Sequence, residues 1–180
     1  DHMVGQITKK LREKGIWENT IFLFMSDNGC SGVADYPFLT SKGHNPSYVF
    51  RGRKADIYEG GHRIPAIFSW PRAYGTRQNC DRMICLSDMY ATFAEMLGVT
   101  IPENAAEDSF SLTSLLQGAD RPVRETIVHS SADGSFSIRD SHWKLELCRG
   151  AGTMGKAQED DPSTSDEVPY QLYDLSADIG

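Results

Sequence analysis

Apolar and polar positions alternate at the start of the chain with helical spacing and then give way to a short, continuous apolar run. Val4, Ile7 and Leu11 recur at this spacing between charged residues, which predicts an amphipathic helix over residues 4–14. Residues 21–25 are entirely apolar and too few to span a membrane, so we expect a strand buried on both faces. A helix, a short loop and a buried strand predict half of a parallel α/β unit.

The later pattern predicts a smaller part that is rich in short strands. Alternation of apolar and charged residues over 143–148 suits a half-buried antiparallel strand. The fold class is therefore α/β, with a mixed or parallel sheet flanked by helices over residues 1–108 and a small antiparallel subdomain with a helix over 109–180. Further expected elements are helices near 87–97 and 109–116 and strands at 126–130 and 136–139.

The first apolar run ends in an acid, an amide and a glycine. Open α/β sheets carry their chemistry just beyond the carboxyl ends of such strands. Asp27 and Asn28 stand there as two hard oxygen donors of the kind that Ca²⁺ accepts, and Gly29 lets the backbone turn away. An ordinary strand-to-loop turn is the alternative, because the same dipeptides are common turn chemistry.

Composition limits the partners. The 180 residues carry a formal net charge of −7 with a pI near 5.2. The chain therefore has no general basic footprint for nucleic acid and no polybasic membrane patch, and we expect neither partner. The 4 cysteines form no CxxC pair and leave the redox compartment undecided.

A cluster of cations follows a long loop over residues 30–48. Arg51, Arg53 and Lys54 lie within four positions, a concentration of charge that suits an anionic substrate. The alternative is a solvated basic loop paired with Asp56 and Glu59.

Two histidines are candidates for substrate contact. His44 lies in the long loop and His129 at the end of a predicted strand. A surface role for His44 and a structural role for His129 remain the alternatives. Glu59, which precedes Gly60 and Gly61, is expected to fix a turn by hydrogen bonding rather than to catalyse.

These stretches carry a family resemblance. The order of the first helix, the apolar strand ending in SDNG, the long loop and RGRKADIYEGGHRIP resembles the C-terminal half of the catalytic domain of the type I sulfatases, in the alkaline phosphatase superfamily. The helix over 88–98 and the segments FSIR, WKL and QLYDL resemble the same family's following helix and C-terminal subdomain.

The resemblance implies a site and a fold. Asp27 and Asn28 would be two ligands of a Ca²⁺ ion and Lys54 the cation that holds the sulfate, while Arg51 could pair with substrate or brace its loop. The sheet would be alkaline-phosphatase-like. The covalent nucleophile, a formylglycine made from a CxPSR or SxPSR motif, would lie upstream, because this chain contains neither motif.

Three functions follow as hypotheses. The first is the C-terminal portion of a calcium-dependent sulfatase that hydrolyses sulfate monoesters, with carbohydrates as the expected substrates, and that needs its missing N-terminal half for activity. The second is a phosphate or phosphonate ester hydrolase of the same superfamily. The third is a non-catalytic module that binds sulfated glycans. The resemblance also implies an extracellular, periplasmic or lysosomal location.

Overall fold

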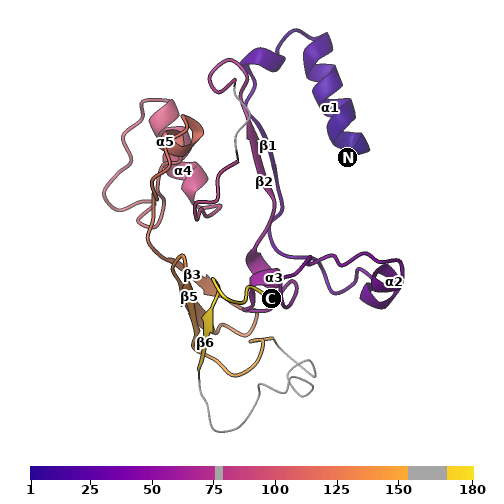
Figure 1. The fold of residues 1–180 in the computed structure, drawn as a ribbon. Coiled ribbons are helices and arrows are strands. Elements are labelled where there is room, and N and C mark those ends of the chain that lie inside the picture. Colours follow the sequence, from indigo (N-terminus) through magenta and orange to yellow (C-terminus); the bar gives the residue numbers. More distant parts are fainter. Residues whose placement is uncertain (76–78, 154–169) are drawn as a thin grey trace. The chain divides into compact units, whose positions relative to one another are not determined.

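The computed structural model describes residues 1–75, 79–153 and 170–180 (Figure 1). These residues form two compact units, which are described separately. Unit 1 comprises Asp1–Met25, Pro65–Arg82 and Ser87–Val123, and unit 2 comprises Ser26–Ile64, Met83–Leu86 and Arg124–Gly180. The predicted boundary after residue 108 stays a prediction.

Unit 1 contains the predicted amphipathic helix and the first strand. The helix ends at Glu13, one residue before the predicted end, and Gly15 follows in the left-handed conformation with φ 68°. Its elements are α1 (His2–Glu13), the 3₁₀ turn η1 (Trp17–Asn19), β1 (Phe22–Met25), β2 (Ala66–Ser69), α4 (Asp88–Met96) and α5 (Thr113–Leu116).

The strands β1 and β2 pair antiparallel, with Phe22 opposite Ser69 and Met25 opposite Ala66. The prediction of a parallel unit is therefore wrong for the part of the chain that the structure describes. Phe24 is also 42% exposed, so β1 is not buried on both faces. A continuous apolar run identifies a strand, but how deeply it is buried depends on neighbours that its own sequence does not specify.

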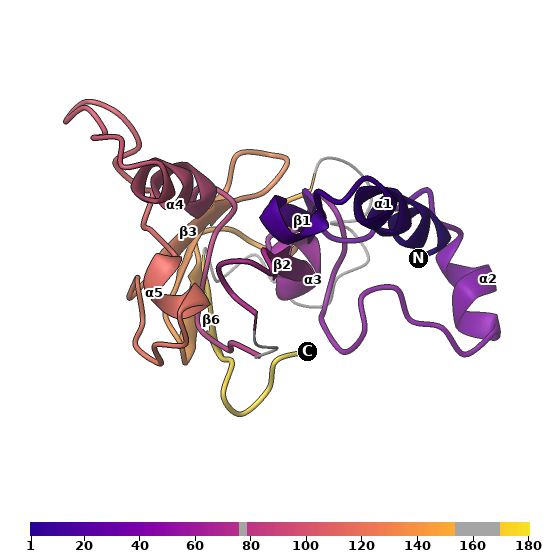
Figure 2. The same cartoon turned by 90° about the horizontal axis from the view of Figure 1, so that it is seen from above.

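Buried polar groups join α4 to the segment that leads into α5, and the two helices lie side by side (Figure 2). Asp88 and Thr92 are fully buried. The Asp88 carboxylate accepts from the Phe110 amide at 3.0 Å, and the Thr92 hydroxyl accepts from the Leu112 amide at 2.9 Å. These bonds satisfy backbone donors that would otherwise be buried without partners.

Unit 2 is built on the antiparallel sheet that the sequence predicts. Its order is β3-β4-β5-β6, with every neighbouring pair antiparallel. No parallel pair occurs among the described strands. The elements of this unit are α2 (Tyr36–Ser41), α3 (Glu59–His62), β3 (Ile127–Ser130), β4 (Phe136–Arg139), β5 (Trp143–Glu146) and β6 (Gln171–Asp174).

Two helical turns lie where loop or turn is predicted. The loop over 30–48 contains α2, whose first turn is capped by the Asp35 carboxylate accepting from the Phe38 amide at 3.2 Å. The Gly60-Gly61 turn lies inside the single helical turn α3. Neither segment is long enough to show an apolar period, which is why pattern alone misses them.

The sheet buries its polar side. Lys144 and Glu146 on β5 are each 1% exposed, whereas Trp143 is 49% and Leu147 57% exposed. The predicted alternation is present, but the charged positions lie inside this unit. Such burial requires partners for every charge: Lys144 contacts Glu59 and His62 of α3, and Glu146 contacts Lys144 and Gln171 of β6.

Two further observations complete the fold. The acidic residues at 159–161 and 166–167 fall outside the described residues. Among the helices that the structure describes, none combines the length and the apolar character needed to cross a membrane.

Candidate functional site

Backbone hydrogen bonds bring two of the sequence motifs together in unit 2. The Gly29 amide donates to the Gly61 carbonyl at 2.8 Å, and the Gly60 amide donates to the Arg51 carbonyl at 2.7 Å. The turn after β1, the start of the cationic segment and α3 therefore meet backbone to backbone. We call residues 27–30 together with 51–54 the corner.

Glycine is required at this junction. A Cβ atom on Gly29 would lie 1.7 Å from the Gly60 carbonyl oxygen, and one on Gly60 would lie 2.3 Å from the Gly52 carbonyl oxygen. A Cβ on Gly61 would lie 2.0 Å from the Asp56 carbonyl oxygen. Any side chain would separate the backbones, so their close approach requires glycine at these three positions.

The backbone of Lys54 is hydrogen-bonded to the other half of the corner, residues 27–30. Its amide donates to the Cys30 carbonyl at 2.9 Å, two residues beyond Asn28. The next residue, Ala55, has φ 86°, which an L-residue with a side chain adopts at a cost of about 1–3 kcal/mol. The strain and the hydrogen bond together place Lys54 at the same end of the loop as the acid and the amide.

Three charged side chains of the corner have no ion pair among the described residues. Among the described residues, the side chains of Asp27, Arg53 and Lys54 form no ion pair, and all three residues are exposed. The Arg53 guanidinium instead lies over the Tyr36 ring, 5.5 Å from its centroid. Charges of both signs are thus exposed at the corner.

The donor set of the corner fits a hard cation. Asp27 offers a carboxylate, and the Asn28 amide nitrogen donates to the Gly29 carbonyl at 2.9 Å, which leaves its side-chain oxygen as an acceptor. The Ser26 hydroxyl holds the Asn28 carbonyl at 2.8 Å. Two side-chain oxygens suit Ca²⁺ but are fewer than the 6–8 that it takes. Within the described ranges, no group of three or more His, Cys, Asp and Glu residues gathers around a common point.

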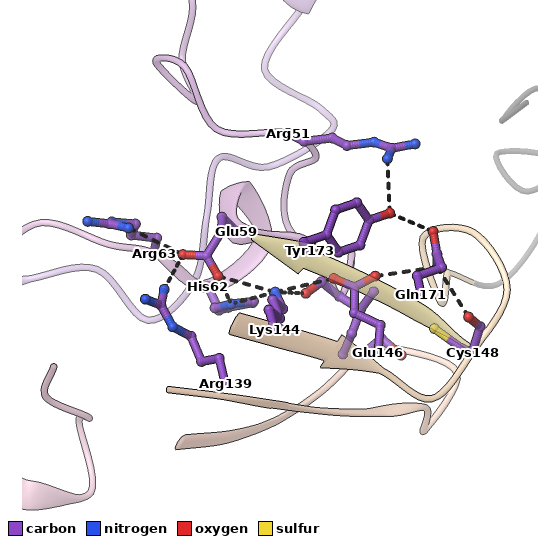
Figure 3. Close-up of polar contacts among 12 residues, drawn as sticks. Arg51, Glu59, His62, Arg63, Arg139, Lys144, Glu146, Cys148, Gln171 and Tyr173 are labelled. Atoms are coloured by element: carbon purple, nitrogen blue, oxygen red, sulfur yellow. Dashed lines mark hydrogen bonds and ion pairs between the residues drawn. The ribbon is translucent and has the colours of Figure 1, made fainter. Parts of the chain in front are cut away.

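A second group of charges surrounds the buried carboxylate of Glu59 in α3, and we call it the Glu59 cluster (Figure 3). The Glu59 carboxylate is 4% exposed and both of its oxygens are engaged. One oxygen receives Arg139 at 2.5 Å and Arg63 at 3.4 Å, and the other lies 3.3 Å from both His62 and Lys144. Glu146 completes the cluster through Lys144.

Electrostatics keep Glu59 ionised. Burial by itself would raise the pKa of this carboxyl, but the hydrogen bond from His62 and the charges of Lys144 and Arg139 outweigh it and hold the pKa far below its usual range. The cations are thereby neutralised within the protein rather than offered to a ligand.

Lys144 is the buried counterpart of Glu59. Its ammonium group donates to the Ile57 carbonyl at 2.5 Å and lies 3.2 Å from the His62 ring nitrogen. Burial lowers the pKa of Lys144, while Glu59 and Glu146 raise it. Glu146 Oε1 lies 3.4 Å from the ammonium without hydrogen-bond alignment, and burial raises the pKa of Glu146 to about 7 despite that charge.

His129 joins this cluster rather than the corner. Its ring stacks on His62, with centroids 3.7 Å apart and planes inclined by 23°. Burial, with the charges of His62 and Lys144, lowers the pKa of His129 to about 3, so its ring is neutral at ordinary pH. A substrate contact for His129 stays a prediction.

The other two candidates lie apart from each other. Arg51 donates to the Tyr173 hydroxyl at 3.2 Å and its guanidinium lies 4.0 Å over the Tyr58 ring. His44 is exposed just after α2, where its amide donates to the Leu39 carbonyl at 3.0 Å. The bracing alternative for Arg51 has direct contacts in its favour, and substrate roles for both residues stay predictions.

Sequence reasoning missed the buried partners of Glu59. Arg139 lies 80 positions away from it and Lys144 lies 85 positions away, and no local motif links them. The available signal was a Lys and a Glu at alternate positions of a strand with a neighbour on each side. That pattern is equally typical of a solvated face.

Comparison with known proteins identifies the family. The family model described as Sulfatase matches residues 1–99, more than half of the chain, and the chain belongs to this family.

Relatives extend the match beyond that range. The N-acetylgalactosamine-6-O-sulfatase of Bacteroides thetaiotaomicron is 32% identical, over 99% of this chain and 35% of its own length. Human arylsulfatase A is 30% identical, over 100% of this chain and 36% of its own length. The chain thus spans about a third of these relatives.

Solved structures agree with the fold. A sulfatase structure from work on glycosaminoglycan metabolism by Bacteroides thetaiotaomicron superposes with a TM-score of 0.82 at 32% identity, covering 97% of this chain and 36% of that chain. A structure in complex with a neocarrahexaose superposes with a TM-score of 0.69 at 23% identity, covering 98% of this chain and 34% of that chain, and supports the fold alone.

Proposed function

We propose that this chain is the C-terminal portion of a calcium-dependent sulfatase that hydrolyses sulfate monoesters on carbohydrates. The observation that carries the proposal is the convergence of the corner. The Lys54 amide is bonded to Cys30, next to the Asp27-Asn28-Gly29 turn, and the charges of Asp27 and Lys54 have no partner among the described residues.

Each residue has a defined part in the proposal. Asp27 and Asn28 would hold the Ca²⁺ ion through their side-chain oxygens, and further ligands would come from outside this chain. Lys54 would bind a non-bridging oxygen of the sulfate as a point charge. Calcium, when bound, supplies a positive charge that stabilises the negative charge on the ester oxygens.

The chemistry needs a group that this chain lacks. The chain contains neither a CxPSR nor an SxPSR motif, so the formylglycine nucleophile is expected in the missing N-terminal half. This chain by itself is then expected to be inactive. The carbohydrate substrate is proposed from the first relative, which is named for a sulfated amino sugar.

The test compares two esters on the whole protein that contains this chain. We expect hydrolysis of an aryl sulfate to exceed that of the matched aryl phosphate by at least about 100-fold in kcat/KM, about 2.7 kcal/mol of transition-state preference. Chelation of divalent cations should remove the sulfatase activity, and added Ca²⁺ should restore it.

Two outcomes would overturn the proposal in different ways. A preference for the phosphate ester would favour the phosphoryl hydrolase alternative. Binding of sulfated sugars without turnover of either ester would favour the glycan-binding module.

A further inference from the structure

Glu59 connects the sheet of unit 2 to the corner. Its own neighbours in α3, Gly60 and Gly61, bond to Arg51 and Gly29 through their backbones. Its side chain points the other way, onto Arg139 of β4 and Lys144 of β5 (Figure 3). Glu59 therefore contacts the sheet through its carboxylate, while its backbone is part of α3, which is hydrogen-bonded to the corner.

The carboxylate has little freedom to move. It is 4% exposed, and each oxygen faces two basic groups. Lys144 fixes the same segment a second time by donating to the Ile57 carbonyl at 2.5 Å. Because the chain is held at positions 57 and 59, Gly60 and Gly61 cannot shift along the sheet unless the ion pairs of Glu59 break.

The corner tolerates no such shift. Gly29, Gly60 and Gly61 pack so closely that a single added carbon would overlap a carbonyl oxygen. A displacement of α3 would pull the Gly61 carbonyl from the Gly29 amide and the Gly60 amide from the Arg51 carbonyl. Asp27, Asn28 and Lys54 would then lose their fixed spacing, on which binding at a preorganised site depends.

We propose that Glu59 is a positioning residue for the corner: its buried ion pairs to β4 and β5 hold Gly60 and Gly61 where their backbones seat residues 27–30 and 51–54. The proposal rests on the proposed function only for the identity of the ligand. The mechanical link can be measured without any turnover.

Glu146 supplies a matched control. It is as buried as Glu59, at 1% exposure, and lies at a similar distance from Lys144, 3.4 Å against 3.3 Å. Its other hydrogen-bond partner among the described residues is Gln171 of β6, at 3.4 Å, and it also interacts with the charge of the Arg51 side chain, but it makes no bond to α3. A variant at Glu146 therefore disturbs the same lysine without touching the backbone of the corner.

The experiment is amide hydrogen exchange on the whole protein, comparing Glu59→Gln with Glu146→Gln. In Glu59→Gln, the amides of Gly29, Lys54 and Gly60 should exchange about tenfold faster or more, because their acceptors are no longer held. In Glu146→Gln, these amides should keep their rates to within about threefold. Equal acceleration in both variants, or none in Glu59→Gln, would overturn the proposal.

A second readout separates positioning from stability. The Ca²⁺ concentration that half-saturates the protein, measured by calorimetry, should rise about tenfold in Glu59→Gln and stay unchanged in Glu146→Gln. An equal rise in both would mean general destabilisation and would contradict a positioning role. If the exchange result holds but neither the parent protein nor the variants bind Ca²⁺, the positioning role stands and the proposed function fails.

A milder variant covers the case in which Glu59→Gln does not fold. Arg139→Gln removes one partner of Glu59 and leaves the carboxylate with Lys144, His62 and Arg63. The same three amides should exchange about threefold faster or more, and their acceleration should exceed that of the amides in β6. Faster exchange confined to the sheet would count against the link.

Discussion

The corner and the Glu59 cluster lie in the same unit and contain the same kinds of side chain, yet they treat charge in opposite ways. Asp27 and Lys54 are exposed and have no ion pair among the described residues, whereas Glu59 and Lys144 are buried and face each other at 3.3 Å. A buried charge must be neutralised by the protein itself, because water does not solvate it. An unpaired charge at the surface costs little and stays available to a ligand.

This contrast teaches how to interpret charge in the motif that spans residues 51–63. Within it, Lys54 and Glu59 are five positions apart. The backbone separates them: Ala55 with φ 86° marks the bend after Lys54, and the chain then enters the buried segment at Ile57, which is 0% exposed. An exposed charge and a buried charge thus lie within one short segment.

The largest loss of stability is expected from a substitution at Lys144, which tests the contrast between buried and exposed charges. Lys144→Met removes the cation between Glu59 and Glu146 and its bond to Ile57, and should lower the free energy of unfolding by about 3–5 kcal/mol, since one partner of a buried pair is lost. Chemical denaturation measures this loss. Lys42→Met, which removes an exposed lysine of the same unit, should change the value by no more than about 0.5 kcal/mol. Similar values for the two variants would show that burial of Lys144 does not matter.

A smaller effect is expected from the pH dependence of the cluster. The pKa of His129 is about 3 in the folded chain, well below that of an unfolded histidine, because its ring is buried beside His62 and Lys144. The unfolded chain then binds the proton first, so stability from this group is present above about pH 6.5 and is lost as pH falls towards 3, by at most about 1.4 kcal/mol per pH unit.

His129→Gln isolates that contribution. Denaturation between pH 7 and pH 4 should show a shallower loss of stability in the variant than in the parent chain. The stability contributed by Glu59 is also lost in acid, but only as pH falls through the ordinary carboxyl range and towards its lowered pKa. An identical slope for both proteins between pH 6 and pH 5 would exclude His129 as the source.

The corner could be predicted from the sequence because its chemistry is local. Asp27, Asn28 and Gly29 are consecutive, and Lys54 lies in a run of cations beside Gly52. What no pattern shows is that the Lys54 amide returns to Cys30, since that hydrogen bond depends on how the intervening loop and α2 fold. The resemblance, and not the spacing, indicated that the two stretches meet.

The support behind the corner could not be predicted for a related reason. Glu59 depends on Arg139 and Lys144, which lie in strands far along the chain. The alternation over β5 identified a strand with two different faces, but a polar face packed against α3 and a polar face in water have the same pattern. The antiparallel pairing of β1 with β2 was not predicted for the same reason, because an apolar run does not specify the strand with which it pairs.

The most direct test of the central claim is kcat/KM for a sulfate ester in Lys54→Ala, measured on the whole protein that contains this chain, beside Lys42→Ala. We expect Lys54→Ala to lose about 10²–10³-fold, the usual loss when one group that stabilises developing charge is removed, with no more than about 0.5 kcal/mol lost from the free energy of unfolding. Lys42→Ala should keep the parent value. Activity unchanged in Lys54→Ala, or lost equally in both variants, would contradict the assignment of Lys54 to the substrate.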